Sequence, residues 1–135
     1  MKKLKRVTLV ALAFFAAMLV SSCATYQVSK DFRGQQVDSA NPGSIPVAYI
    51  HAKNYGYYLF NTYPIISGDC EDVGRTSWFT DNANPHNAVD LLTKKAKELG
   101  AFKTIDVQTT HRESGAYTFW IFWYRGTQSS GTAIK

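Results

Sequence analysis

The sequence lacks the short motifs that mark the commonest enzyme and metal sites. It contains no Gly-x-Ser-x-Gly nucleophile motif and no phosphate-binding glycine loop. None of the three histidines, His51, His86 and His111, has a partner at the His-x-x-x-His spacing of zinc sites. We therefore predict that the protein is not an enzyme and has no catalytic residues, no metal and no cofactor.

Cysteine is also scarce, because the chain of 135 residues contains only Cys23 and Cys70. Cys70 lies in the polar, turn-rich stretch 67–74, so we expect its side chain to be partly exposed. The neighbouring carboxylates Asp69 and Glu71 should raise the pKa of the Cys70 thiol. A catalytic thiolate is therefore not expected at this position.

The chain has almost no net charge after its first 22 residues. Four of the 15 basic residues and none of the ten acidic residues lie in that segment, which leaves 11 basic against ten acidic side chains and a net charge of +1. The one locally basic stretch, 94–97, lies where a helix is expected to end, and cations there favour the helix dipole. Nucleic-acid-binding proteins carry a concentrated basic patch. Nucleic acid is therefore not an expected partner.

The first 22 residues have the composition of an export signal. A basic start, Met1–Arg6, is followed by a run over 7–20 that is apolar except for Thr8, and then by two serines before Cys23. A run of this length is short for a membrane span, which needs about 20 apolar residues. The pattern predicts a signal peptide over residues 1–22.

The four residues Val20-Ser21-Ser22-Cys23 resemble the lipobox of bacterial lipoprotein precursors. The resemblance implies cleavage before Cys23, diacylglycerol on its sulfur, a further acyl chain such as palmitate on its amino group, and attachment to a membrane. Ala24 follows Cys23, which favours the outer membrane, facing the periplasm. A plain secretory signal is the alternative. Residues 57–68 and 96–101 also resemble, loosely, small bacterial lipoproteins of unknown function.

The remainder of the chain divides into a tether and one domain. Residues 23–44 have few apolar positions and end in an Asn-Pro-Gly turn signal, so we expect a lipidated N-terminus and a flexible linker. A coil of this length reaches about 25 Å. Residues 45–135 then form a single domain.

The domain is expected to belong to the α+β class. Strands are predicted over 46–51 and 55–60 with a turn at Lys53-Asn54, a short extended piece over 64–66, and a long connection over 68–84. Strands over 104–110 and 117–125 follow a helix and are joined by a turn over 111–116. The expected fold is a two-layer sandwich in which an antiparallel sheet of about four strands, in the order β-β-α-β-β, packs against one helix.

The helix over 85–99 has the clearest signals. Asn84 can cap it, Pro85 suits its first position, and Gly100 can end it. Apolar residues recur at helical spacing at Ala88, Leu91, Leu92, Ala96 and Leu99. This apolar stripe should cover one face of the sheet.

The last predicted strand has apolar side chains on both faces. Phe119, Ile121 and Trp123 point one way and can pack beneath the helix. Trp120, Phe122 and Tyr124 point the other way, and contiguous apolar patches are rarely left uncovered. Cover by the 62–83 segment through Trp78 and Phe79, association with another protein or a second copy, and a ligand all stay open.

Two functions follow from these patterns. The first is a non-catalytic binding or structural module of the envelope, anchored through Cys23, that interacts through a surface containing Trp78, Phe79, Trp120, Phe122 and Tyr124. The second is a domain that binds a small ligand, a metal or peptidoglycan in the 62–84 loop. Residues Cys70, Glu71, Asp72, Asp81 and His86 could converge there, although their spacing matches no recognised metal site.

Overall fold

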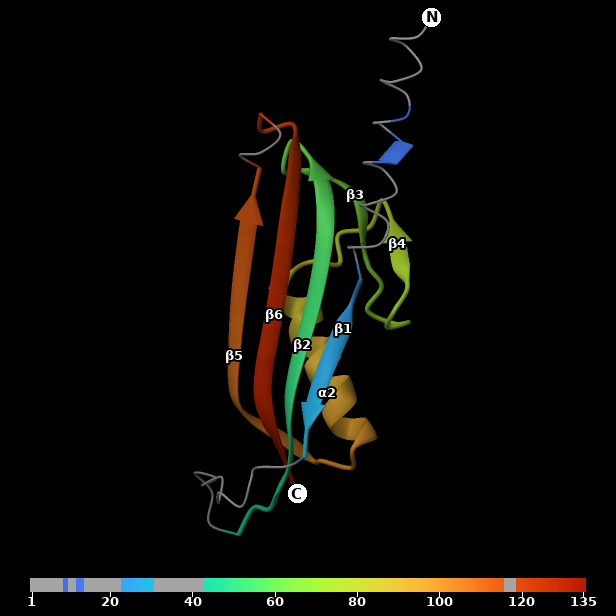
Figure 1. Ribbon diagram of the computed structural model, residues 1–135. Helices are drawn as coiled ribbons and strands as arrows, with labels where there is room; N and C mark the ends of the chain where they lie inside the picture. Colours follow the sequence, from blue (N-terminus) through green and yellow to red (C-terminus); the bar gives the residue numbers. More distant parts are fainter. Residues whose placement is uncertain (1–8, 10–11, 14–22, 31–42, 116–118) are drawn as a thin grey trace, which may run out of the picture.

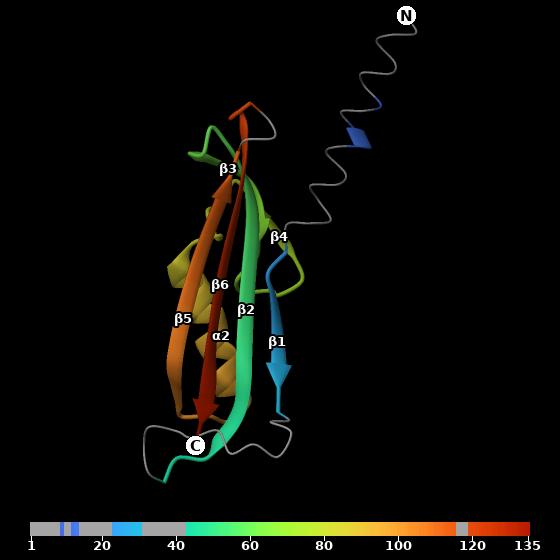
Figure 2. The ribbon, with the colours of Figure 1, turned by 60° about the vertical axis from the view of Figure 1, so that its left-hand side comes forward.

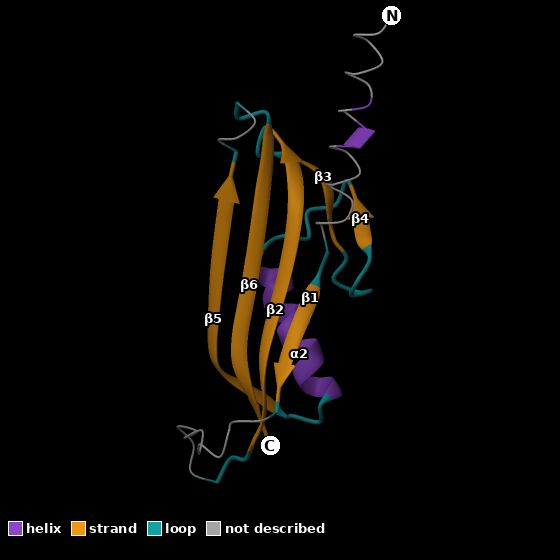
Figure 3. Ribbon diagram, viewed as in Figure 1, coloured by secondary structure: helices purple, strands orange, loops and turns teal. Residues whose placement is uncertain are grey.

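The structure, a computed structural model, consists of an antiparallel sheet with one helix packed on it (Figure 1). It describes residues 9, 12–13, 23–30, 43–115 and 119–135. The strands are β1 (Thr25–Ser29), β2 (Pro46–Leu59), β3 (Tyr63–Gly68), β4 (Thr76–Trp78), β5 (Lys103–Ser114) and β6 (Phe122–Ile134), and the helix is α2 (Pro85–Glu98). The strand order is β4-β3-β2-β6-β5, and β1 also pairs with β2. The α+β class, the antiparallel sheet and the single packed helix confirm the prediction at this level (Figure 3).

The number and order of strands differ from the expected β-β-α-β-β pattern, because the described part of the sheet has six strands. The turn predicted at Lys53-Asn54 was wrong: β2 runs through it without a break. Alternate residues of β2 from Ala48 to Tyr58 are buried on the helix side, and Asn54 stays in this register because its amide bonds the loop that passes over the sheet. A buried polar contact thus allows a turn-forming residue to lie inside a strand.

Strand β6 begins and ends later than the predicted strand over 117–125. Residues 119–121 form a turn, residues 116–118 lie outside the described part, and the strand continues to Ile134. Its second half contains mostly Gly, Ser, Thr and Ala, which resembles a loop in composition. Alternate members of this run, Thr127, Ser129 and Ala133, are fully buried on the side of the sheet that faces α2. Close helix packing, rather than β propensity, explains the composition of this strand.

The predicted helix is confirmed, including its ends. The Asn84 side chain accepts a hydrogen bond from the Asn87 backbone N–H at 2.9 Å, and Gly100 has a φ of +77°, which favours glycine. Ala88, Leu91, Leu92 and Ala96 are buried in the core, as the apolar stripe predicted. Leu99 packs partly buried against them.

The segment after Cys23 belongs to the sheet. Residues 25–29 pair with Tyr49–Lys53 of β2, and Ala24 is fully buried in the core. The expectation of a flexible linker over 23–44 therefore does not hold for residues 24–29. Residues 24–29 join the sheet because the side chains of Tyr26 and Val28 pack against the core. Two alternating apolar residues are too few to identify a strand from the sequence.

Strand β5 is longer than predicted and contains an irregularity. Its pairing with β6 shifts between Ile105 and Gln108, and Asp106 has a φ of +54°. Val107 is consequently exposed, whereas Ile105 is half-buried. The predicted turn over 111–116 was also wrong, because the strand continues to Ser114 and includes His111. Among the described residues, no helix is both long and apolar enough to cross a bilayer.

Candidate functional site

Exposed aromatic side chains gather at one end of the sheet, which we call the aromatic end. It consists of three segments: 60–63 between β2 and β3, 78–80 at the end of β4, and 119–121 before β6. Phe119 is 90% exposed, Phe79 77% and Trp120 61%. Phe60, Tyr63, Trp78 and Ile121 are exposed beside them. Figures 1 and 2 place the β2–β3 and β5–β6 turns at the end opposite the C-terminus.

Backbone contacts join the three segments. The Phe60 N–H donates to the Ile121 carbonyl at 2.8 Å, which connects the turns on either side of the β2–β6 pair. The Phe79 N–H donates to the Ile65 carbonyl at 3.2 Å, and Trp78 pairs with Ile66 in β3. The segments 60–63 and 119–121 are therefore bonded directly to each other, and the segment 78–80 is connected to them through β3.

The aromatic residues at this end occupy an unusual backbone conformation. Among the described residues, six that are not glycine have positive φ, and five of them are Phe60, Asn61, Phe79, Phe119 and Trp120. Bulky side chains rarely adopt this left-handed region, which favours Gly, Asn and Asp. Backbone of this kind persists where surrounding contacts fix it, and it concentrates at functional sites.

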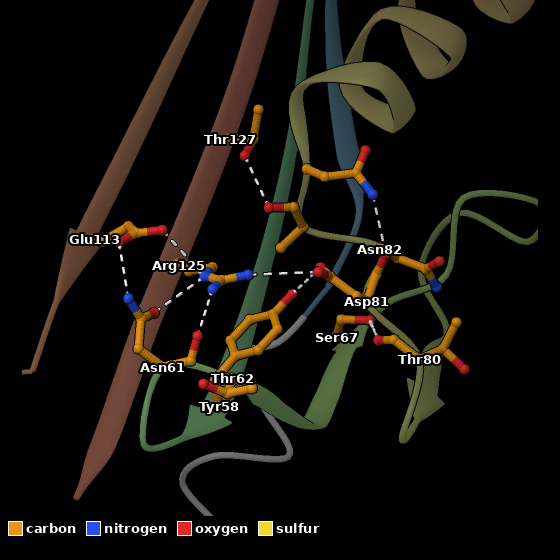
Figure 4. A network of polar contacts seen from close by, with 12 residues as sticks. Tyr58, Asn61, Thr62, Ser67, Thr80, Asp81, Asn82, Glu113, Arg125 and Thr127 are labelled. Carbon is orange, nitrogen blue, oxygen red and sulfur yellow. Dashed lines mark hydrogen bonds and ion pairs between the residues drawn. The ribbon is translucent and has the colours of Figure 1, made fainter.

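A polar network is centred on Arg125 (Figure 4). The Arg125 guanidinium donates to the Asn61 carbonyl at 2.5 Å and to the Asn61 side-chain oxygen at 3.1 Å. It also lies 3.4 Å from an Asp81 carboxylate oxygen and 3.1 Å from Glu113. Since Asn61 and Asp81 belong to or directly follow two of the aromatic segments, one side chain connects them to β5 and β6.

Tyr58 supports the same network from β2. It is fully buried, its hydroxyl donates to Asp81 at 2.5 Å, and the Arg125 guanidinium lies 4.3 Å from the centre of its ring. Burial, followed by the hydrogen bond to Asp81, raises the pKa of the Tyr58 phenol well above its usual value. Tyr58 is therefore a neutral donor throughout the physiological range.

Glu113 and His111 complete the network on β5. The His111 ring contacts Glu113 at 3.0 Å and the Thr127 hydroxyl at 2.7 Å. Hydrogen bonds from His111 and Asn61, with Arg125 nearby, lower the pKa of the Glu113 carboxyl. In this network one guanidinium, that of Arg125, forms ion pairs with two carboxylates, Asp81 and Glu113.

The structure separates the five residues predicted to form one interaction surface. Trp78, Phe79 and Trp120 lie at the aromatic end, where Trp120 packs on Trp123 with ring centres 5.2 Å apart. Phe122 and Tyr124 lie in β6, half-buried, on the sheet face opposite α2. The segment 62–83 does not cover Trp120, which is exposed, and β3 and β2 separate β4 from β6.

The face opposite α2 has its own aromatic cluster. The Tyr124 ring stacks on Tyr55 at 5.6 Å between ring centres and meets Tyr57 edge-on at 5.7 Å. Burial among these rings raises the pKa of Tyr124 to about 12. In the described part of the chain no helix covers this face (Figure 2).

Cys23 lies against the folded domain. A Cβ added at Gly68 would be 2.1 Å from the Ala24 nitrogen and 2.6 Å from the Cys23 carbonyl carbon, so the backbone of both residues rests on this glycine. The Gly74 N–H donates to the Ala24 carbonyl at 3.2 Å. The residue predicted to carry lipid therefore lies next to the sheet, with its backbone against Gly68.

A polar pocket of about 470 Å³ lies beside Cys70, between the β3–β4 connection and α2. It is lined by Asp69, Cys70, Glu71, Ser77, Thr80, Asn82, Asn87, Asp90 and Lys94. Below it, the buried Asn54 amide donates to the Cys70 sulfur at 3.1 Å and to the Asn82 carbonyl at 2.8 Å. The pocket belongs to the 62–84 loop and its contact with the helix.

The Cys70 thiol is half-buried, and its pKa is raised to about 11. Burial is the largest cause, and the Asp69 carboxylate adds to it. We expect alkylation of native Cys70 by iodoacetamide to be slow at pH 8 and to increase up to about pH 11. The folded thiol has the higher pKa, so its stabilising contribution is complete below the unfolded value of 9.0 and is lost as the pH rises towards 11. Mass spectrometry of timed samples measures the rate, and rapid labelling of the folded protein at neutral pH would contradict the assigned burial.

The other residues considered for metal binding do not come together. Within the described ranges, no group of three or more His, Cys, Asp or Glu side chains could hold a metal ion. His86 pairs with Asp90 on the exposed side of α2, and Asp81 belongs to the Arg125 network. His51 lies within β2 and contacts Gln128.

Sequence reasoning missed the Arg125 network altogether. Tyr58, Asp81, Glu113 and Arg125 are far apart in the chain, and no spacing connects them. The one available signal was a charged residue at the end of the aromatic run 119–124, because a charged residue normally requires a partner when it is buried.

Comparison of the chain with protein families, with curated proteins and with solved structures finds no match.

Proposed function

We propose that this protein is a lipoprotein of the bacterial envelope, attached through acylated Cys23 to the outer membrane on its periplasmic side. The lipobox-like residues 20–23 support the attachment site. The observation that carries the proposal is the burial of the residue that follows Cys23: Ala24 is fully buried, and β1 begins at Thr25. Sheet structure thus follows directly on the proposed lipid-bearing residue, where the cleaved chain would begin.

The attached domain is proposed to act as a non-catalytic interaction module. The Cys70 sulfur accepts a hydrogen bond from Asn54 and has a raised pKa, which disfavours a nucleophilic thiolate. The face opposite α2 presents Tyr49, Phe122 and Tyr124 to a partner, either another envelope protein or a second copy. Aromatic residues of this kind are enriched at protein interfaces.

Replacing Cys23 tests the anchor. In cells supplied with labelled palmitate, the wild-type protein should carry the label and sediment with membranes, because two or more chains are needed for stable attachment. The Cys23→Ala variant should carry no label and lose its stable membrane attachment. Cys70→Ala is the matched control, and it should be labelled like the wild type. Labelling of Cys23→Ala, or an unlabelled wild-type protein, would refute the proposal.

Binding of a small polar ligand is a second candidate function, and the pocket beside Cys70 favours it. Three carboxylates, Asp69, Glu71 and Asp90, line this pocket with the single cation Lys94, so a cationic or hydroxyl-rich ligand suits it better than an anion. Native mass spectrometry of the purified protein would detect such a ligand as a bound mass.

A further inference from the structure

We propose that the aromatic end lies in the headgroup region of the bilayer that the lipid on Cys23 enters, so that the domain is held in a fixed orientation. The inference rests on the proposed lipid anchor and adds a second contact to it. It assigns the three aromatic segments to a lipid surface, and it leaves the sheet face opposite α2 for proteins.

The lipid site and the aromatic end lie near each other on the sheet. Because β1 is antiparallel to β2 and Thr25 pairs with Lys53, Cys23 lies level with Tyr55. Trp78 joins through Ile66 to Tyr57, two residues farther along, and β2 ends at Leu59. These steps correspond to about 7 and 13 Å at 3.3 Å per residue. In both Figure 1 and Figure 2, β1 runs from the middle of the sheet away from these turns, toward the end where the C-terminus lies.

The contact at Gly68 fixes the distance between Cys23 and the aromatic end. The backbone of Cys23 and Ala24 rests on Gly68, and Ala24 is fully buried, so little free chain separates the lipid from the sheet. Acyl chains on Cys23 must enter the membrane beside β3 and β4. The nearest exposed aromatic residues, Trp78 and Phe79, are then brought to the lipid surface.

The composition of the aromatic end suits the polar–apolar boundary of a bilayer. The segments 60–63, 78–80 and 119–121 contain Phe, Trp, Tyr and Ile together with Asn and Thr, and none of their residues is charged. Trp and Tyr prefer the headgroup level of membranes because their rings are amphipathic. Phe102 offers a contrast: it is 74% exposed between α2 and β5, but it is followed by Lys103 and lies away from the aromatic end.

The backbone holds these rings outwards. Phe60, Phe79, Phe119 and Trp120 all have φ between +49° and +64°, where glycine or asparagine would be less strained. Arg125 fixes two of the turns through Asn61 and Asp81. A strained backbone thus keeps large apolar side chains exposed to solvent. Contact with lipid in place of water explains why these side chains are apolar.

Spin labels on the lipidated protein test the inference. In a Cys70→Ser background, single cysteines replace Phe79, Phe119 or, as a control, Phe102, and the protein is reconstituted in vesicles of phosphatidylethanolamine and phosphatidylglycerol. We expect the ratio of oxygen to nickel-chelate collisions to be several-fold higher at positions 79 and 119 than at position 102, because oxygen concentrates in lipid. Intact mass and flotation with the vesicles confirm the anchor in each sample.

The possible results separate the two proposals. Protein that carries acyl mass and floats, but has equal collision ratios at all three positions, would overturn the inference and leave the anchor intact. A label at position 119 that is immobilised but exposed to the nickel chelate would instead indicate a protein contact and would also overturn it. Protein without acyl mass that fails to float would overturn the anchor and the inference together.

Discussion

Replacing Gly68 with alanine is expected to lower the free energy of unfolding by about 3 kcal/mol, the upper part of the range for an overpacked core. The added Cβ would lie 2.1 Å from the Ala24 nitrogen and 2.4 Å from the Asn54 side-chain oxygen. The Ala24 atom is backbone and cannot rotate away, so β1 must move. Urea denaturation measures the stability, and hydrogen exchange should show reduced protection of the β1 amides.

Gly43 provides the matched control for this substitution. It has a φ of +98°, and a Cβ there would meet nothing within 4 Å. Gly43→Ala should therefore cost only the strain of the left-handed region, about 1–2 kcal/mol, and leave β1 protected. Equal losses in the two variants would mean that the Cys23–Ala24 segment does not rest on Gly68.

Replacing Arg125 with alanine is expected to cost about 2–3 kcal/mol, because hydrogen bonds to charged groups are worth more than neutral ones and their partners stay behind unpaired. The Arg125 side chain is 18% exposed, contacts Asn61, Asp81 and Glu113, and covers the Tyr58 ring. Arg125→Lys should recover only part of the loss, since an ammonium group cannot reproduce the planar fork. Thermal and urea unfolding measure both variants.

Arg112 is the control for Arg125, because it lies exposed on the neighbouring strand β5. Arg112→Ala should change the free energy of unfolding by no more than about 0.5 kcal/mol.

The stability loss caused by Arg125→Ala should also depend on pH. Bonds from His111 and Asn61, and then Arg125, lower the pKa of Glu113, so the stability that Glu113 contributes is present above its ordinary pKa of 4.5 and is lost as the pH falls below it. The difference between wild type and Arg125→Ala should therefore shrink in acid, and a difference that is constant down to pH 3 would exclude Glu113 from the network.

The parts of the fold that were predictable from sequence are those with local signals. Helix α2 was predicted with its cap at Asn84 and its end at Gly100, because each of these features lies within a few residues of the helix. Its buried stripe was predicted for the same reason. The α+β class followed from one amphipathic helix among β-rich segments.

The predicted strand boundaries were wrong where tertiary contacts override the local conformational preference of the residues. Asn54 reads as a turn residue, yet it lies within β2 because its buried amide bonds the loop from Gly68 to Asn82. The second half of β6 reads as a loop, yet its small residues form the surface on which α2 packs. In both cases a partner that is distant in the sequence decides the conformation.

The candidate site was only half predictable. Trp78, Phe79 and Trp120 were identified by their aromatic composition, but Phe122 and Tyr124 proved to lie on a different face. The strand was expected to begin before residue 119, whereas residues 119–121 form a turn, which changes which side chains share a face. Arg125 and its partners had no local signal, because they meet only when β2, β5, β6 and the 81–84 segment are assembled.

Intact mass spectrometry of the protein purified from bacterial membranes tests the acylated Cys23 anchor most directly. We expect one main species whose polypeptide begins at Cys23 and carries the added mass of a diacylglyceryl group and a further acyl chain. A polypeptide that begins at any other residue, or one that begins at Cys23 without acyl mass, would contradict the lipid anchor and the membrane orientation inferred from it.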